Sequence, residues 1–283
     1  MIPDLEICFN LGWLFGRSPP CRQKAAHTII ICCSMTRDHS VLPHLSTNVV
    51  IQSAKLSVNG HQAHYLKAGS GDPVVLLHGG ASDSRDWLGT LDALADSYTC
   101  YAPDLIGYGY SEGIKEGYYL SDFVEFAMGF TEALGLQSSV MVGHSLGGRV
   151  CLEIAFRYPE RVRRLVLINT AGFSKLGRWG AFLGTLVWQG RMLLRHRQPY
   201  PKFLKENGKY GDWLCLDELP SLRVSTLVVW SRHDLYYSLA GARQAVALIP
   251  EARLEVLPCR GHAPHVRRRD SFNRVLLEFL SDG

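Results

Sequence analysis

Residues 138–159 read SSVMVGHSLGGRVCLEIAFRYP, and they contain a strand pattern, a serine between glycines and a helix pattern in direct succession. The run SSVMV is apolar and β-branched, as in a strand that is buried on both faces. From Leu146 onward, apolar residues recur every three to four positions, as in an amphipathic helix. Gly143 and Gly147 stand two residues before and after Ser145. Because glycine permits a sharp, strained turn, the segment predicts a nucleophilic Ser145 lifted above a sheet edge.

Short apolar runs alternate with amphipathic stretches on both sides of this segment. The apolar runs occupy 73–79, 98–104, 164–170 and 225–231, and helical spacing is found at 86–95, 121–134, 146–158, 237–248 and 266–280. This alternation is typical of βαβ units on a parallel sheet. Two earlier runs meet at Asn59-Gly60, a pair that favours a hairpin turn. We therefore expect an α/β fold with a mostly parallel, doubly wound sheet that opens with an antiparallel pair.

One long segment interrupts the alternation. Residues 173–219 hold no strand-like run, and their aromatic residues stand among Arg and Gly. We interpret this segment as a short helical lid inserted between two parts of a core, 47–172 and 220–283. Residues 1–46 are then a poorly defined N-terminal extension, and because residues 1–34 show no clear period, a translation start at Met35 is a further hypothesis.

Composition limits the classes of partner. The formal net charge is only +4 and the basic residues are scattered, unlike the basic stripe of a nucleic-acid binder. No apolar run reaches the roughly 18 residues of a membrane span. Cys100, Cys151, Cys215 and Cys259 stand singly in apolar segments, where a buried reduced thiol is the usual outcome. We expect a cytoplasmic protein that acts on a small molecule, without cofactor, metal, nucleic acid or membrane span. Its oligomeric state is left open, and a homodimer is one alternative.

Three motifs together resemble the α/β-hydrolase superfamily: VGHSLGGRVCLEIAFRYPERVRRLVLINTAG, LLHGGASD before it, and PDLIGYGYS between them. The resemblance extends from about residue 48 to the end, with some likeness to esterases and to meta-cleavage product hydrolases. It implies the α/β-hydrolase fold and a chain order of serine, acid and histidine. It also implies that the backbone N–H groups of Gly80 and Leu146 form an oxyanion hole.

A serine hydroxyl needs a base, and the base needs a carboxylate to orient it. The histidines that follow Ser145 are His196, His233, His262 and His265. His262 lies on a Gly- and Pro-flanked loop after the run LEVLP, where the resemblance places the base, and His265 is its alternative. Asp234 follows the run STLVVW, at the sheet edge where open α/β folds gather their ligands. LINTAG supplies no carboxylate, so we expect Asp234 to hold His262.

Other acidic residues receive structural interpretations. Asp104, in PDLIGYGYS, matches a recurrent pattern of the superfamily, and we interpret it as holding the loop beneath the site. Asp212, Asp217 and Glu218 belong to the end of the lid and are expected to face solvent.

The leading functional expectation is hydrolysis of a carboxylic ester or related acyl compound through an acyl-enzyme. The aromatic lid points to a substrate with an apolar part. The lid residues Arg178, Arg191, Arg195 and Arg197 either neutralise an acidic head group or, as we expect for most of them, face solvent. The alternatives are carbon–carbon bond hydrolysis of a diketo acid, as in meta-cleavage product hydrolases, and a non-catalytic homologue that only binds a ligand.

Overall fold

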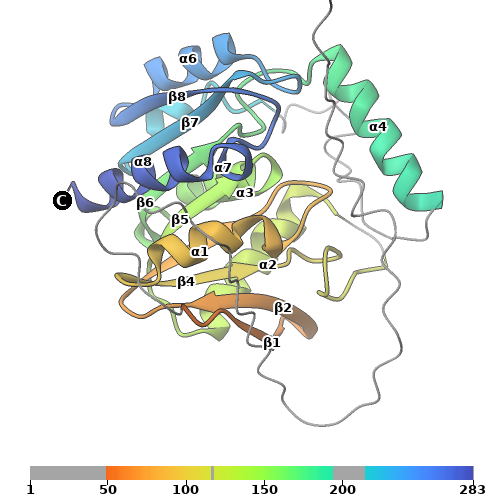
Figure 1. The fold of residues 1–283 in the computed structure, drawn as a ribbon, viewed down its shortest axis with the longest axis vertical. Helices are drawn as coiled ribbons and strands as arrows, with labels where there is room; N and C mark the ends of the chain where they lie inside the picture. Colours follow the sequence, from red (N-terminus) through yellow and green to blue (C-terminus); the bar gives the residue numbers. More distant parts are fainter. Residues whose placement is uncertain (1–48, 116–117, 194–213, 283) are drawn as a thin grey trace, which may run out of the picture.

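The computed structural model of the chain describes residues 49–115, 118–193 and 214–282, and its centre is an eight-stranded sheet (Figure 1). The strand order is β1-β2-β4-β3-β5-β6-β7-β8. The pairs β1–β2 and β2–β4 are antiparallel, and all other neighbouring strands are parallel. The strands are β1 Gln52–Val58, β2 His61–Ala68, β3 Asp72–Leu77, β4 Tyr98–Pro103, β5 Ser139–His144, β6 Val162–Ile168, β7 Thr226–His233 and β8 Ala252–Arg260.

The antiparallel opening of the sheet is confirmed. Asn59 and Gly60 have φ values of 50° and 82°, the left-handed conformation of a tight hairpin turn. Val58 therefore pairs directly with His61, and β1 and β2 stay in register along their length.

Helices cover both faces of the sheet. They are α1 Leu88–Leu94, α2 Leu120–Ala133, α3 Leu146–Arg157, α4 Arg178–Leu193, α6 Leu239–Leu248, α7 Pro264–Arg267 and α8 Arg269–Ser281, with 3-10 turns η2 Ser84–Trp87, η3 Pro159–Arg161 and η5 Leu219–Ser221. Helices α2, α3 and α6 contribute to one core, and α1 and α8 to the other. Strand β3 serves both, because Val75 and Leu77 face the first core while Val74 and Leu76 face the second. The predicted doubly wound α/β fold is confirmed.

The last predicted helix, 266–280, is two helices in the structure. Pro264 begins α7, and Arg268, with φ −126° and ψ 45°, separates it from α8. A single straight helix presents only one stripe to the core. The break allows α7 to bury His265 while α8 buries its own apolar face, including Leu276.

The segment interpreted as a lid contains α4, which stands apart from the two helical layers in Figure 1. Its beginning is tied to the loop after β7, since the Gly177 amide donates to the Tyr236 carbonyl at 2.7 Å. Residues 194–213, which include Arg195, His196, Arg197 and Asp212, lie outside the described residues, as does the extension 1–46 with Met35. The division into lid and core therefore stays a prediction.

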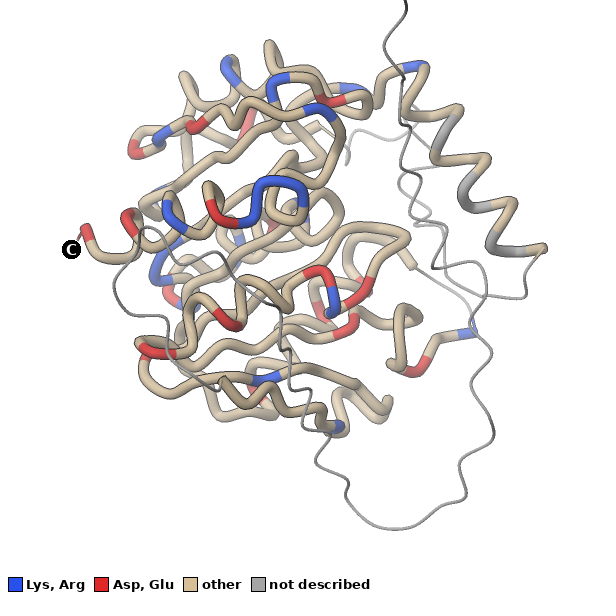
Figure 2. Tube along the Cα trace, in the orientation of Figure 1, with Lys and Arg blue, Asp and Glu red and all other residues tan. Residues whose placement is uncertain are grey.

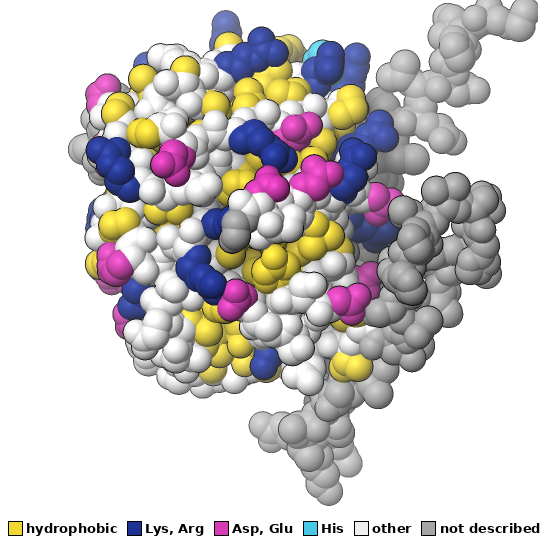
Figure 3. Space-filling model, turned by 90° about the vertical axis from the view of Figure 1, so that its left-hand side faces the viewer, with side chains coloured by type: hydrophobic (Ala, Val, Ile, Leu, Met, Phe, Trp, Pro, Cys, Tyr) yellow, Lys and Arg dark blue, Asp and Glu magenta, His cyan; other side chains and the backbone are white. Residues whose placement is uncertain are grey.

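Charged residues of both signs are interspersed along the chain, with a short basic run at 267–269 between α7 and α8 (Figure 2). The face in Figure 3 likewise mixes basic, acidic and apolar side chains. Among the described helices, none combines the length and the apolar character that a bilayer crossing needs.

Four cysteines, Cys100, Cys151, Cys215 and Cys259, are buried free thiols. Burial raises the pKa of Cys100 to about 12 and that of Cys215 to about 11. These thiols are therefore protonated at neutral pH and make poor nucleophiles.

Candidate active site

Ser145 stands at the junction between β5 and α3 in a strained conformation. Its φ and ψ are 53° and −110°, and its amide donates to the Ile168 carbonyl at 2.9 Å, which ties the turn to β6. A non-glycine residue in a sparsely populated conformation costs about 1–3 kcal/mol. The strain turns the chain abruptly into α3, with Ser145 before the first residue of the helix.

The glycines around Ser145 are required by close backbone contacts. A Cβ atom on Gly143 would lie 2.4 Å from the carbonyl oxygen of Gly147, and one on Gly147 would lie 2.3 Å from the carbonyl oxygen of Leu77. Both obstacles are main-chain atoms, which have little freedom to move. The spacing of glycines in the sequence is thus explained by α3 packing directly on β5 and β3.

The structure brings Ser145, His262 and Asp234 together. The Nε2 atom of His262 lies 2.8 Å from Ser145 Oγ, and its Nδ1 atom lies 2.9 Å from Asp234 Oδ2. The Asp234 side chain is fully buried and that of His262 is 16% exposed. With a proton on Nδ1 donated to the carboxylate, Nε2 is left free to accept the proton of the serine hydroxyl.

Two residues that the sequence analysis missed support this group. Asn169, at the end of β6, donates its Nδ2 to Asp234 Oδ2 at 2.7 Å, and its own Oδ1 accepts from the Ser231 amide at 2.9 Å. The Tyr236 ring stacks on the His262 imidazole with centroids 4.5 Å apart. Asp234 also accepts from the Tyr236 amide at 2.8 Å. The signals were present in LINTAG and in DLYY, but neither motif states which distant side chain it will meet.

Gly80 lies close to the side chain of Leu146, the residue after Ser145. A Cβ atom built on Gly80 would be 4.0 Å from Leu146 Cδ2, so the two segments approach each other closely. The loop before Gly80 is held by His78, whose Nε2 accepts from the Leu105 amide at 2.9 Å and whose Nδ1 donates to the Gly79 carbonyl at 2.8 Å. A Cβ atom on Gly79, the residue before Gly80, would lie 3.2 Å from Ser145 Cβ, so this loop passes close to the serine.

Asp104 lies at the centre of a buried hydrogen-bond network. Its carboxylate accepts from the amides of Ser84 and Tyr110 at 2.7 and 2.8 Å and pairs with His64 Nδ1 at 2.7 Å. Burial alone would raise its pKa, but these hydrogen bonds and the nearby His78 lower the pKa to about 2. The contacts support the interpretation that Asp104 holds the loops below the site.

His265, the alternative base, does not contact Ser145. It packs between Trp87 and His144, with centroids 4.5 Å from each ring, and burial lowers its pKa to about 3. His144 is also buried, its pKa lies well below the usual value for the same reason, and its Nε2 donates to the His262 carbonyl at 2.8 Å. Both imidazoles are therefore neutral at physiological pH.

The remaining candidates lie away from Ser145. Among the described residues, His233, Arg178, Asp217 and Glu218 are exposed, and no hydrogen bond joins them to the serine, histidine and aspartate group. Asp217 and Glu218 face solvent, as expected.

The sheet order and the strand–serine–helix turn define the class of the α/β-hydrolase fold. A family profile described as alpha/beta hydrolase fold matches residues 72–201. A 2-hydroxymuconate semialdehyde hydrolase from Pseudomonas sp. (strain CF600) is 40% identical over 259 residues, which cover 79% of this chain and 92% of that protein. The chain belongs to the α/β-hydrolase family.

Solved structures agree with this assignment. A meta-cleavage product hydrolase from Pseudomonas fluorescens IP01 matches with a TM-score of 0.69 and 26% identity, covering 81% of this chain and 97% of that one. A carboxylesterase from Bacillus subtilis matches with a TM-score of 0.69 and 24% identity, covering 82% and 92%. The second likeness shows the shared fold.

Proposed function

We propose that this protein hydrolyses a small-molecule substrate at a carbonyl carbon, with Ser145 as nucleophile, His262 as base and Asp234 as the residue that orients it. The observation that supports this most directly is the pair of contacts made by His262, 2.8 Å to Ser145 Oγ and 2.9 Å to Asp234 Oδ2. Both distances are those of hydrogen bonds that transfer or orient a proton.

The reaction proceeds in two halves. Ser145 Oγ attacks the carbonyl carbon while His262 Nε2 takes its proton, and the same proton then goes to the leaving group as the tetrahedral intermediate collapses. A water molecule attacks the resulting acyl-enzyme, again with His262 as base. The buried Asp234 carboxylate stabilises the imidazolium in both halves, and Asn169 and the Tyr236 amide hold that carboxylate in place.

We assign the stabilisation of the oxyanion to the backbone N–H groups of Gly80 and Leu146. Leu146 is the first residue of α3, so its amide belongs to the positive end of the helix dipole. Donors fixed before the reaction stabilise a developing negative charge without reorganisation.

Considered without the comparisons, the candidate site favours a carboxylic ester as the substrate class. We propose that residues 173–219 cover it as a lid and receive an apolar acyl or aryl part. Helix α4 carries exposed Trp179, Phe182 and Leu186 at helical spacing. An apolar surface beside a polar catalytic group suits a substrate with both characters.

Carbon–carbon bond hydrolysis of a keto acid is the second candidate. Its support is the 40% identity to a 2-hydroxymuconate semialdehyde hydrolase over nearly the whole of that protein. The same serine, histidine and aspartate are proposed to act in this case, with a carbon leaving group in place of an alcohol.

A substrate panel on the wild type and on Ser145→Ala tests the proposal. Acyl esters of graded chain length and a diketo acid are assayed in parallel, and product analysis separates the two candidates. Ser145→Ala should lower turnover by on the order of 10⁴- to 10⁶-fold. The matched control is Ser57→Ala, an exposed serine on β1, which should leave turnover unchanged. Full activity of Ser145→Ala, or failure of a fluorophosphonate probe to label wild-type Ser145, would refute the proposal and favour a ligand-binding homologue.

A further inference from the structure

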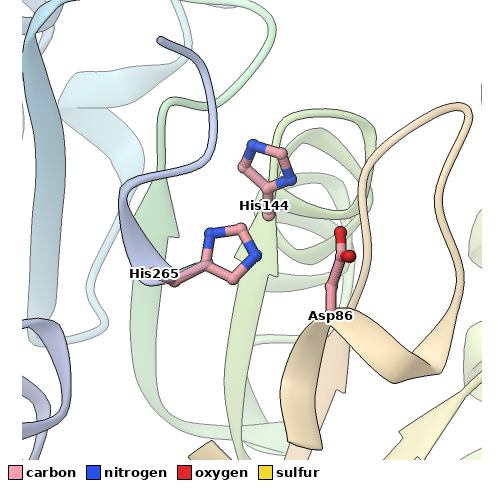
Figure 4. A group of neighbouring side chains, drawn as sticks. All are labelled: Asp86, His144 and His265. Atoms are coloured by element: carbon pink, nitrogen blue, oxygen red, sulfur yellow. The ribbon is translucent and has the colours of Figure 1, made fainter. Parts of the chain in front are cut away.

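Asp86, His144 and His265 come from three separate elements and meet behind the catalytic group. Asp86 belongs to η2, His144 is the last residue of β5, and His265 lies in α7. One donor atom from each side chain lies within 4.8 Å of the other two. Figure 4 shows both imidazoles with a ring nitrogen turned toward the Asp86 carboxylate.

Three ring nitrogens in this cluster have no hydrogen-bond partner among the described residues. They are His144 Nδ1 and both ring nitrogens of His265. The two side chains belong to residues only 5% and 1% exposed. Buried polar atoms in proteins are nearly always satisfied. Each of these histidines therefore has an unpartnered ring nitrogen that can serve as its donor atom in the cluster, which indicates a missing ligand.

The donor set is that of a transition-metal site. His144 Nε2 donates to the His262 carbonyl, which leaves Nδ1 as a lone-pair donor, and such a second hydrogen bond is the usual support of a metal-binding histidine. The Ser82 hydroxyl donates to the Asp86 carboxylate and supports it in the same way. We propose that Asp86, His144 and His265 bind one divalent transition-metal ion, with Zn²⁺ as the best match to two imidazoles and a carboxylate.

The geometry requires only a small adjustment. Tetrahedral Zn²⁺ with ligands at about 2.0–2.1 Å holds its donor atoms about 3.4 Å apart. The donors lie within 4.8 Å of one another, so metal binding requires them to approach by up to about 1.4 Å. Three protein ligands leave a fourth position for water.

The charges of the cluster fit the same ligand. Burial keeps both imidazoles neutral, the form that binds metal, and it raises the pKa of Asp86. The Ser82 hydroxyl, His78 and Arg85 oppose this rise, and Asp83 adds to it. A cation placed among these groups would stabilise the Asp86 carboxylate.

Metal binding would join η2, β5 and α7 at a point next to the loop that carries His262. None of its ligands is Ser145, His262 or Asp234, so the metal site does not depend on the proposed hydrolase activity. Binding is therefore measured on both the wild type and Ser145→Ala, and the two should behave alike.

The test is equilibrium dialysis of the full-length, tag-free chain against Zn²⁺, with metal analysis and thermal unfolding. We expect one Zn²⁺ per chain and a higher Tm in its presence. Asp86→Asn, nearly isosteric, and His265→Gln should each weaken binding at least roughly ten-fold, because each removes a ligand. The matched control is His61→Gln, at the start of β2 and outside the cluster, which should bind as the wild type does.

The chain has eight cysteines, which could also bind metal. The absorption spectrum of bound Co²⁺ distinguishes the two cases, because thiolate ligands give a strong charge-transfer band that nitrogen and oxygen ligands lack. Circular dichroism without metal establishes which variants are folded, and one folded variant is sufficient. The proposal is overturned if the wild type shows no saturable Zn²⁺ binding. This is the result expected if a water molecule, and no metal ion, bridges the three side chains. It is equally overturned if folded variants bind unchanged, or if the Co²⁺ spectrum is that of thiolate.

Discussion

At the scale of single residues, Asn169 connects Asp234, the proposed acid, to β7. Its amide donates to Asp234 and accepts from Ser231. Replacing Asn169 by Ala should lower kcat by roughly ten-fold or more, since loss of a buried hydrogen bond to a charged group costs about 1.5–3 kcal/mol. Steady-state kinetics of the purified variant measures this.

The control for that change is Asn273→Ala. Asn273 is also a buried amide with two hydrogen bonds, to Thr90 and Gly89, but it lies in α8. It should lower stability and leave kcat unchanged, and equal losses of kcat in both variants would contradict a specific role for Asn169.

Asn169 also shows where sequence reasoning at this scale ends. The motif LINTAG contains no carboxylate, and this leaves Asp234 as the candidate acid. The side-chain amide of Asn169 in this motif does not by itself indicate a role in catalysis. Its importance arises from the meeting of β6 and β7, 65 residues apart at this contact.

The lowered pKa of Asp104 predicts that the stability of the fold depends on pH. Its pKa in the folded protein is about 2, below the ordinary value of 3.8. The carboxylate therefore stabilises the fold above pH 4, and this contribution, about 2 kcal/mol, is lost as the pH falls from 4 to 2. Asp104→Asn should be less stable at pH 7 and should lose less stability over that interval. Chemical denaturation at several pH values measures both, with Asp92→Asn, exposed on α1, as the control that should follow the wild type.

At the scale of elements, Tyr236 connects α4 to the candidate catalytic residue His262. A Cβ atom on Gly180 would lie 2.7 Å from Tyr236 Cα and 2.9 Å from the Leu235 carbonyl. Gly180→Ala should therefore displace Tyr236 from its stack on His262 and lower kcat/KM by roughly 10- to 100-fold. Enzyme kinetics on the substrate identified by the panel measures the loss.

Gly190→Ala is the matched control in the same helix. A Cβ atom there meets nothing within 4 Å, so the change should add about 1 kcal/mol of helix propensity and leave kinetics unaltered. If Gly180→Ala behaved in the same way, α4 would not influence the site through Tyr236.

Elements with a strong local pattern were predicted within a few residues. The helices expected at 121–134 and 146–158 are Leu120–Ala133 and Leu146–Arg157 in the structure. The break at Arg268 was missed because the apolar spacing continues through it, and its cause is packing by His265 and α8 rather than a local helix-breaking residue. Contacts such as that of α4 with Tyr236 join distant segments and leave no periodic signal.

At the scale of the whole molecule, the parallel sheet assembles the candidate site from distant parts of the chain. Ser145 follows β5, Asp234 follows β7 and His262 follows β8, so all three lie at carboxyl ends of strands. This common edge is why the sequence order of motifs was enough to nominate them. The cluster of Asp86, His144 and His265 lies behind the same edge and was not expected, because its residues have no metal-ligand spacing in the sequence.

The sheet also couples the two cores, which predicts a single unfolding transition. Leu152 in α3 and Leu276 in α8 are fully buried on opposite faces. Each Leu→Ala change should cost about 2–5 kcal/mol and lower Tm by roughly 2–4 °C for each kcal/mol. Because strands such as β3 contribute side chains to both cores, either change should shift the same transition, and the double variant should lose close to the sum. Leu193→Ala, at a leucine 84% exposed on α4, is the control that should leave Tm unchanged. Two separate transitions in calorimetry would instead mean that the two cores unfold independently. The strands that carry the candidate site would then lose the packing on one face before the packing on the other.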